Sequence, residues 1–185
     1  MLTKITICQI FVYVCNERIM QKLNLPAFGI RIRQNRSGKE EIFDPFRRRF
    51  VRLTREEWVR QHFLNFLVTQ KGYPTAVILV EGSLTYNRLK KRSDILVYDT
   101  AGNPCLVVEC KAPEVEITQD VFDQVAMYNM SLTVGFLVVT NGLQHYACRI
   151  DHRTKTFKFL KEIPEYREIT GVLTESGKTC ASSAI

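Results

Sequence analysis

The chain has 185 residues, of which 45% are hydrophobic and 24% charged, and this composition is typical of one ordinary globular domain with its own core. The formal net charge of +7 favours polyanionic partners, although a solvated basic surface explains it equally well. The six cysteines form no C-x-x-C pair and have no histidines at metal-ligand spacing, which argues against zinc and indicates reduced thiols in a cytoplasmic protein. No segment approaches transmembrane length, so no membrane partner is expected.

The first 53 residues carry weak signals. Residues 29–33 predict a short strand, and residues 35–39 have the composition of a turn. We hypothesise that Met20 is the natural start and that the segment before it is adventitious. Three parts are expected along the chain: an extension over residues 1–19, one domain over 20–160 and a polar tail over 161–185.

A helix is predicted from Thr54 to about Gln70. Thr54 and Glu57 form a capping box at its start, and the sequence Lys-Gly-Tyr-Pro over residues 71–74 ends it. One face of this helix gathers the side chains expected to pack: Val59, His62, Phe63, Phe66 and Leu67.

The middle of the chain predicts a sheet with a second helix. Strands are expected over residues 76–80, 93–99, 105–111, 134–139 and 145–150, and a helix over 118–130. The second and third strands flank a turn and are predicted to form a hairpin. The fourth strand follows a helix, so we expect it to lie parallel to one strand of the hairpin. The predicted fold class is α/β, one domain with a mixed β-sheet flanked by helices.

Three charged residues are expected to meet at one edge of this sheet. Glu109 and Lys111 are two residues apart on one strand and must project from the same face. Counted back across the hairpin, Asp94 falls near their level. An exposed salt bridge would explain Glu109 and Lys111 alone, but charges held at the end of an apolar strand usually have a task.

An Asp, a Glu and a Lys together suit the hydrolysis of a phosphodiester. Two carboxylates offer the hard oxygen ligands that Mg²⁺ prefers. A bound metal ion generates a nucleophilic hydroxide and neutralises charge on the phosphoryl oxygens. A neighbouring lysine orients the water or stabilises that charge.

Both helices offer further candidates. Gln124 and Tyr128 are four residues apart, and we expect their shared face beside the sheet end that carries Lys111, although ordinary amphipathicity also explains the pattern. In the first helix, Glu57 has a local task in the capping box. Glu56, at the edge of the packing face, is therefore the better candidate for a carboxylate that reaches the sheet.

These residues resemble the motifs of the PD-(D/E)xK nuclease superfamily. The sequence segments on which the resemblance rests are LTREEWVRQHF, KRSDILVYD, VECKAP, QVAMY and VTNGLQHY. The stretch from about residue 25 to 150 is similar to the N-terminal nuclease domain family of type I restriction enzyme R proteins. The resemblance implies a restriction-endonuclease-like domain that cleaves DNA with Mg²⁺, or with Mn²⁺ in its place.

The resemblance also implies a role for each matching residue. Asp94 and Glu109 would bind the metal, with the Cys110 carbonyl as a further ligand. Lys111 would assist the attacking water. The remaining catalytic candidates are Glu56, which matches the helix acid of the superfamily, and Gln124 and Tyr128, which match its Q-x-x-x-Y motif and would position substrate or the lysine strand.

Partners and alternatives follow from the same comparison. DNA is the expected partner, together with other restriction or repair subunits. No G-x-x-x-x-G-K-[ST] motif of an ATP-driven motor occurs in these 185 residues. A non-catalytic module that binds nucleic acid or a partner, a nuclease acting on RNA and a purely structural domain remain as alternatives, and no oligomeric state is predicted.

Overall fold

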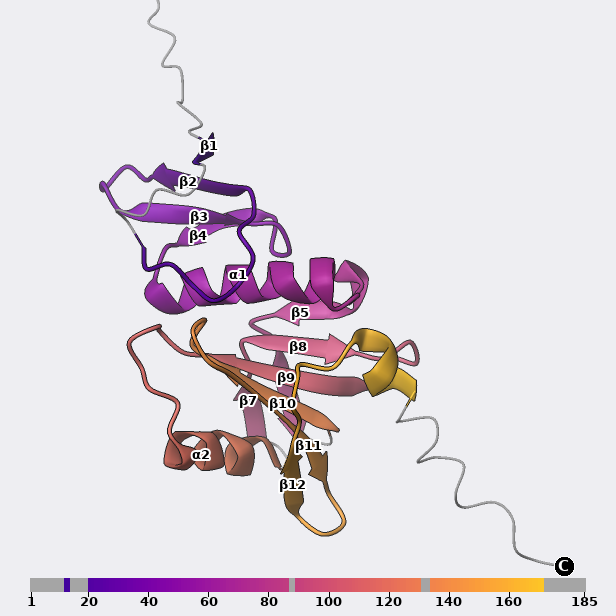
Figure 1. Ribbon diagram of the computed structural model, residues 1–185. Helices are drawn as coiled ribbons and strands as arrows, with labels where there is room; N and C mark the ends of the chain where they lie inside the picture. The colour runs from indigo at the N-terminus through magenta and orange to yellow at the C-terminus, as the bar shows by residue number, and fades with distance from the viewer. Residues whose placement is uncertain (1–11, 14–19, 87–88, 131–133, 172–185) are drawn as a thin grey trace, which may run out of the picture.

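The computed structural model describes residues 12–13, 20–86, 89–130 and 134–171 (Figure 1). The strands are β1 Val12–Tyr13, β2 Ile30–Gln34, β3 Glu40–Asp44, β4 Arg49–Arg52, β5 Ile78–Val80, β6 Ser83–Tyr86, β7 Leu89–Arg92, β8 Ile95–Tyr98, β9 Pro104–Cys110, β10 Phe136–Thr140, β11 His145–Asp151 and β12 Thr156–Phe159. The helices are α1 Arg55–Gln70 and α2 Gln119–Met130, with a 3₁₀ turn η1 Thr75–Val77 and a helical turn over residues 166–171.

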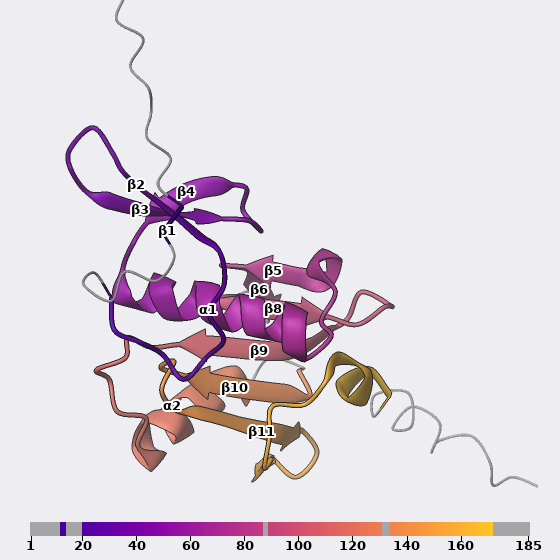
Figure 2. The ribbon, with the colours of Figure 1, turned by 45° about the horizontal axis from the view of Figure 1, so that its top comes forward.

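A six-stranded mixed sheet forms the centre of the fold. Its strand order is β12-β11-β10-β9-β8-β5, in which β9 and β10 are parallel and the other neighbours are antiparallel. Helix α1 packs on one face and α2 on the other (Figures 1 and 2). The expected α/β class with a mixed sheet flanked by helices is confirmed.

The alternation of side chains along β9 explains why the sheet has two covered faces. Leu106 and Val108 belong to the apolar cluster that contains α1, whereas Val107 belongs to the cluster that contains α2. All five residues of β10 are buried, as its continuous apolar sequence predicts.

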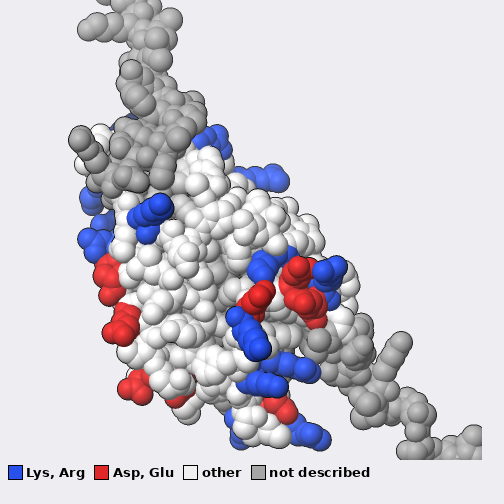
Figure 3. All heavy atoms as spheres, in the orientation of Figure 1, with Lys and Arg blue, Asp and Glu red and all other residues white. Residues whose placement is uncertain are grey.

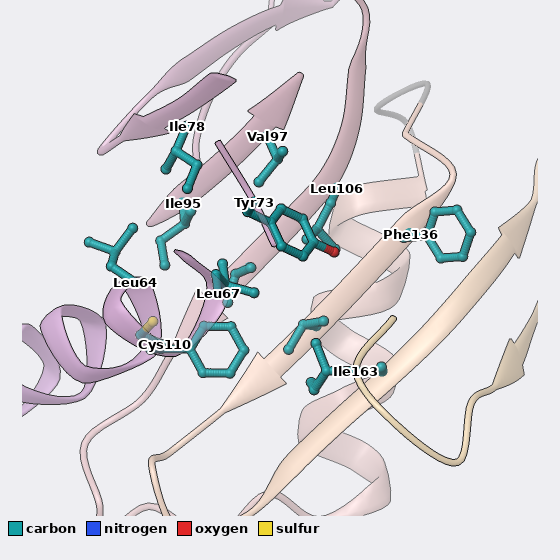
Figure 4. Close-up of a cluster of buried hydrophobic side chains, with 14 of the residues drawn as sticks. Leu64, Leu67, Tyr73, Ile78, Ile95, Val97, Leu106, Cys110, Phe136 and Ile163 are labelled. Atoms are coloured by element: carbon teal, nitrogen blue, oxygen red, sulfur yellow. The ribbon is translucent and has the colours of Figure 1, made fainter. Parts of the chain in front are cut away.

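The larger cluster lies between α1 and the central sheet (Figure 4). Leu64 and Leu67 of α1 meet Ile95 of β8 there, and all three side chains are fully buried. Tyr73, which follows α1, is also buried, and its hydroxyl donates a hydrogen bond to the Pro164 carbonyl at 3.0 Å. Each fully buried aliphatic side chain contributes about 1.5–3 kcal/mol, so this layer stabilises the platform that carries the site.

A second sheet, β1-β2-β3-β4, lies on the far side of α1 (Figure 1). Its inner face buries Ile42 and Asp44. Two arginines of β2 stack on aromatic rings of the outer face: the Arg31 guanidinium lies 3.7 Å from the ring centre of Phe43, and a second arginine covers Phe50 in the same way.

Several predicted elements are confirmed. Thr54 caps α1 and the helix ends at Gln70, where Gly72 adopts a left-handed φ of 69°. The hairpin of β8 and β9 and the parallel pairing of β9 with β10 are both present. Part of the stretch expected as one strand over residues 76–80 is instead the 3₁₀ turn η1, and β5 begins only at Ile78.

Other elements were not predicted. Strands β3, β4, β6, β7 and β12 are short and carry many charged or polar residues, so no apolar alternation marks them. Residues 161–185 were expected to form a polar tail. Ile163 and Ile169 are instead buried in the α1 cluster, so the packed domain extends beyond residue 160. Of the expected extension, β1 pairs with β2, and the other residues before Met20 lie outside the described residues. No helix within the described ranges is long and apolar enough to cross a membrane.

Candidate active site

Asp94 stands at the end of β8 opposite the last residues of β9. The antiparallel register pairs Ile95 with Val108, which brings Asp94 level with Glu109. The Oδ2 atom of Asp94 accepts a hydrogen bond from the Cys110 backbone N–H at 2.7 Å. The backbone of β9 therefore fixes the Asp94 carboxylate at the expected edge of the sheet.

Glu109 and Lys111 meet at the same edge. The Lys111 Nζ lies 3.2 Å from Glu109 Oε1, and the two side chains are 28% and 26% exposed, respectively. The Lys111 backbone N–H donates to the Thr140 carbonyl at 2.8 Å, so the parallel strand β10 holds this residue in register. Both charged groups are partly shielded and still open to a ligand.

Like charges lie close together around Glu109. Burial and the nearby Asp94 carboxylate raise the pKa of Glu109, and the Lys111 ammonium opposes that rise only in part. The carboxylate of Glu56 adds a smaller effect in the same direction. An additional cation at this edge would relieve the repulsion, which is the electrostatic condition of a metal site.

The oxygen atoms present suit a hard divalent cation. Asp94 and Glu109 supply carboxylates and Cys110 a backbone carbonyl, the ligand types that Mg²⁺ and Mn²⁺ take together with water. In the described part of the chain, no three His, Cys, Asp or Glu side chains form a metal-binding group.

A buried arginine, which the sequence did not single out, anchors Asp94. Arg60 of α1 is only 6% exposed, and its Nη2 lies 2.5 Å from Asp94 Oδ1. Its Nη1 pairs with Glu57, one turn earlier on the helix. Burial alone would lower the pKa of Arg60, but the Asp94 and Glu57 carboxylates raise it above its ordinary value.

The network continues through elements far apart in the sequence. Arg47, between β3 and β4, lies 2.5 Å from Glu57 Oε1 and 2.6 Å from Glu81 Oε2, and it also pairs with Asp44. Glu81 approaches Arg60 at 3.6 Å. No periodicity predicts such a cluster, because its members come from separate turns, strands and a helix.

Of the two acids in the first helical turn, Glu57 differs from expectation in the position of its carboxylate. The Glu57 N–H donates to Thr54 Oγ1 at 3.0 Å, as the cap requires. Its carboxylate, expected to serve the cap, is instead buried against Arg47 and Arg60. The reason is packing: the turn before β4 covers this side of the helix and brings Arg47 to it. Glu56 is exposed and acts on Glu109 only through its charge.

Helix α2 carries the remaining candidates. Phe122 and Ala126 form its buried face, and Gln124 is exposed. Among the described residues, no hydrogen bond joins Gln124 to Asp94, Glu109 or Lys111. Tyr128 belongs to α2, and its side chain lies outside the part that the structure describes.

The turn after β10 braces the end of β9. Thr140 Oγ1 lies 2.7 Å from His145 Nδ1, and His145 Nε2 donates to the Asn24 carbonyl at 3.2 Å. Asn141 Nδ2 donates to the Val115 carbonyl at 2.9 Å, which ties the loop after Lys111 to this turn. The sequence segment VTNGLQHY contains this turn, but the contacts by which it holds the end of β9 are made with distant segments of the chain.

The partly buried His145, which follows this turn at the start of β11, predicts a pH-dependent stability. Burial lowers the pKa of His145 and outweighs its hydrogen bond to Asn24. The unfolded state, with an ordinary imidazole pKa of about 6.5, therefore takes up a proton before the folded state does. Stability contributed by the neutral imidazole is complete above that pH and is lost as the pH falls through it. We expect the free energy of unfolding, measured in urea, to decline less from pH 7 to 5 in His145→Gln than in the wild type; parallel declines would contradict this.

A pocket of about 500 Å³ lies elsewhere, between α1, η1 and the turn before β4. Its lining includes Phe46, Gln61 and Ile78, and none of Asp94, Glu109 or Lys111. The candidate site is therefore separate from this pocket.

Residues 55–164, more than half of the chain, match the family model of the Type I restriction enzyme R protein N terminus. The chain belongs to this family. All of β8, β9, α2 and β10 fall within the matched residues of the R protein N-terminal family, as do Asp94, Glu109 and Lys111.

One solved structure similar to this family member is a fragment described as "a putative HsdR subunit of a type I restriction enzyme" from Vibrio vulnificus YJ016. The two sequences are 22% identical, with a TM-score of 0.49. The match covers 66% of this chain and 26% of that one, so the chain spans about a quarter of the fragment's length. No curated protein matches the chain.

Proposed function

We propose that this domain is a metal-dependent nuclease that hydrolyses phosphodiester bonds of DNA. The observation that supports it most directly is the meeting of Asp94, Glu109 and Lys111 at one sheet edge. Membership of the Type I restriction enzyme R protein N-terminal family supports the same conclusion. The partners that follow are DNA and other subunits of a restriction or repair system, and the location that suits this substrate and unpaired buried thiols is the cytoplasm.

In this proposal Asp94, Glu109 and the Cys110 carbonyl hold Mg²⁺, with Mn²⁺ as an alternative. When bound, the ion would lower the pKa of a coordinated water and offset charge on the phosphate. Asp94 keeps its orientation because Arg60 contacts its Oδ1 and the Cys110 N–H donates to its Oδ2. The site is then organised before substrate arrives.

Lys111 is assigned to the reacting phosphate. Its ammonium lies beside Glu109, and the Lys111 side chain is 28% exposed. The ammonium can therefore contact either the charge that develops on the phosphoryl oxygens or the attacking water. Glu56, exposed at the start of α1, is retained as the helix acid, and Glu57 supports the site through Arg60. Gln124 and Tyr128 are proposed to position substrate when DNA is bound.

The test is cleavage of supercoiled plasmid and of single-stranded DNA by the intact protein. We expect nicked or shortened products with Mg²⁺ or Mn²⁺ and none with excess EDTA. The assay should include labelled RNA, because the chemistry at phosphorus is shared. Cleavage of RNA alone would replace DNA by RNA in the proposal. Tight, salt-sensitive DNA binding without cleavage on any substrate would favour a non-catalytic binding module with this fold.

A further inference from the structure

One end of the N-terminal sheet is continuous with the start of α1. The turn over residues 35–39 joins β2 to β3, and next to it the Leu53 N–H donates to the Glu40 carbonyl at 3.0 Å. Thr54 then caps α1. The turn, the end of β4 and the first turn of the helix therefore lie side by side, at the left of Figure 1.

This end also adjoins the candidate active site. Arg55, the first residue of α1, forms an ion pair with Glu114, three residues beyond Lys111. Glu56, the next residue of the helix, acts on Glu109 through its charge. A ligand that crosses the start of α1 consequently reaches the carboxylates at the end of β9.

Exposed cations gather at this end of the sheet, beside Glu40 and Glu41 of β3 and Glu56 of α1. Five exposed residues define what we call the basic end: Arg33, Arg36, Lys39, Arg52 and Arg55. Two of them have acidic partners, Glu41 for Arg33 and Glu114 for Arg55. Within the described ranges, no acidic side chain pairs with the other three. Figure 3, in the same orientation as Figure 1, shows Lys and Arg along the upper left margin and Asp and Glu below them.

The turn presents its cations in a defined conformation. Asn35 Oδ1 accepts hydrogen bonds from the backbone N–H groups of Ser37 and Lys39, each at 3.0 Å. Gly38 adopts a left-handed φ of 75°, which a glycine allows without strain. Arg36 and Lys39 thus belong to a closed turn, and little backbone conformational entropy is lost when they bind.

We propose that the basic end binds the phosphate backbone of DNA and guides it to the edge formed by Asp94, Glu109 and Lys111. The partner is a polyanion because three neighbouring cations lack acidic partners, and binding it releases condensed counterions. Contacts of this kind position a duplex without reading its sequence. The inference rests on the proposed nuclease function and assigns it a substrate-holding surface outside the catalytic residues.

The experiment reverses two charges at the basic end and two elsewhere. Arg36→Glu with Lys39→Glu is the test variant; Lys158→Glu with Lys161→Glu is the control, which makes the same change in net charge. Lys158 of β12 lies opposite Arg149 of β11. Lys161 is next to Glu162, whose carboxylate pairs with Lys71 just after the end of α1. Helix α1 has 16 residues and is about 24 Å long, which separates the control from the basic end.

Binding to a labelled duplex is measured by fluorescence anisotropy over a range of salt concentrations, without divalent metal. For the test variant we expect affinity to fall roughly tenfold or more at about 0.1 M salt, and the salt slope to fall by about 0.9 for each phosphate that the variant no longer neutralises. The control should stay close to the wild type. Equal losses of affinity in both variants, an unchanged slope in the test variant or no duplex binding by the wild type would overturn the proposal.

The proposed nuclease activity can be tested separately from the proposed binding surface. Lys111→Ala retains the basic end, so its salt slope should differ from that of the wild type by no more than about 0.9, the share of the one phosphate assigned to Lys111, whether or not the wild type cleaves. If the wild type binds DNA through the basic end and never cleaves it, the proposed nuclease activity is wrong and the proposed binding surface stands. Where cleavage occurs, the test variant should show a raised KM and an unchanged kcat. If the test variant lost binding to RNA and kept full binding to DNA, the basic end would be an RNA-binding surface and the proposal would be wrong.

Discussion

Replacing Lys111 by alanine is expected to lower the rate of DNA cleavage roughly 10²–10³-fold, the usual effect of removing one preorganised group that stabilises charge in the transition state. The change removes the ammonium beside Glu109 and leaves the backbone bond from residue 111 to the Thr140 carbonyl. Because the residue is partly exposed at a strand end, the fold should be retained.

The measurement is single-turnover cleavage at saturating protein, together with DNA affinity in the absence of divalent metal. Lys158→Ala, on the exposed strand β12, is the matched control and should cleave like the wild type. A folded Lys111→Ala variant with wild-type cleavage would remove this residue from the mechanism. Failure of the variant to bind DNA would instead make Lys111 a binding residue.

Replacing Arg60 by methionine is expected to lower the free energy of unfolding by about 3–5 kcal/mol. Methionine matches the apolar stem of arginine but leaves Glu57 and Asp94 without the cation that lies between them. The loss is large because the guanidinium is buried, and removal of one partner from a buried ion pair leaves the remaining charge in a poorly hydrated environment.

Arg55→Met supplies the control on the same helix. Arg55 is 67% exposed and pairs with Glu114 at the surface, so its removal should change stability by at most about 1 kcal/mol. Urea unfolding is followed by the fluorescence of Trp58, the one tryptophan of the chain, which lies between these positions on α1. Similar losses of stability in the two variants would show that the Arg60 network adds no stability beyond a surface pair.

The same Arg60 variant probes the site. If Arg60 orients Asp94 for a metal ion, Arg60→Met should weaken Mn²⁺ binding measured by calorimetry, and Arg60→Lys should restore part of it. An Arg60→Met variant that stays folded and binds Mn²⁺ as tightly as the wild type would limit Arg60 to a structural role.

The strands that carry the site could be predicted from local signals in the sequence. Periodicity of two along CLVVECK placed Glu109 and Lys111 on one face, and the hairpin turn brought Asp94 to their level. The cap at Thr54 and the helix that crosses from β9 to β10 were equally predictable, because these signals are local or depend on one short connection.

The surroundings of that site depend on contacts between distant segments, which no local pattern predicts. Arg47, Glu57 and Arg60 resemble ordinary surface charges in the sequence, and they are buried together because the β3–β4 turn folds over the first turns of α1. The outer strands β3 and β4 form through pairing with each other and with β2, which no single segment encodes. Local patterns fix which residues share a face; which distant charges meet, and which carboxylate of a neighbouring pair is buried, depends on how separate elements pack.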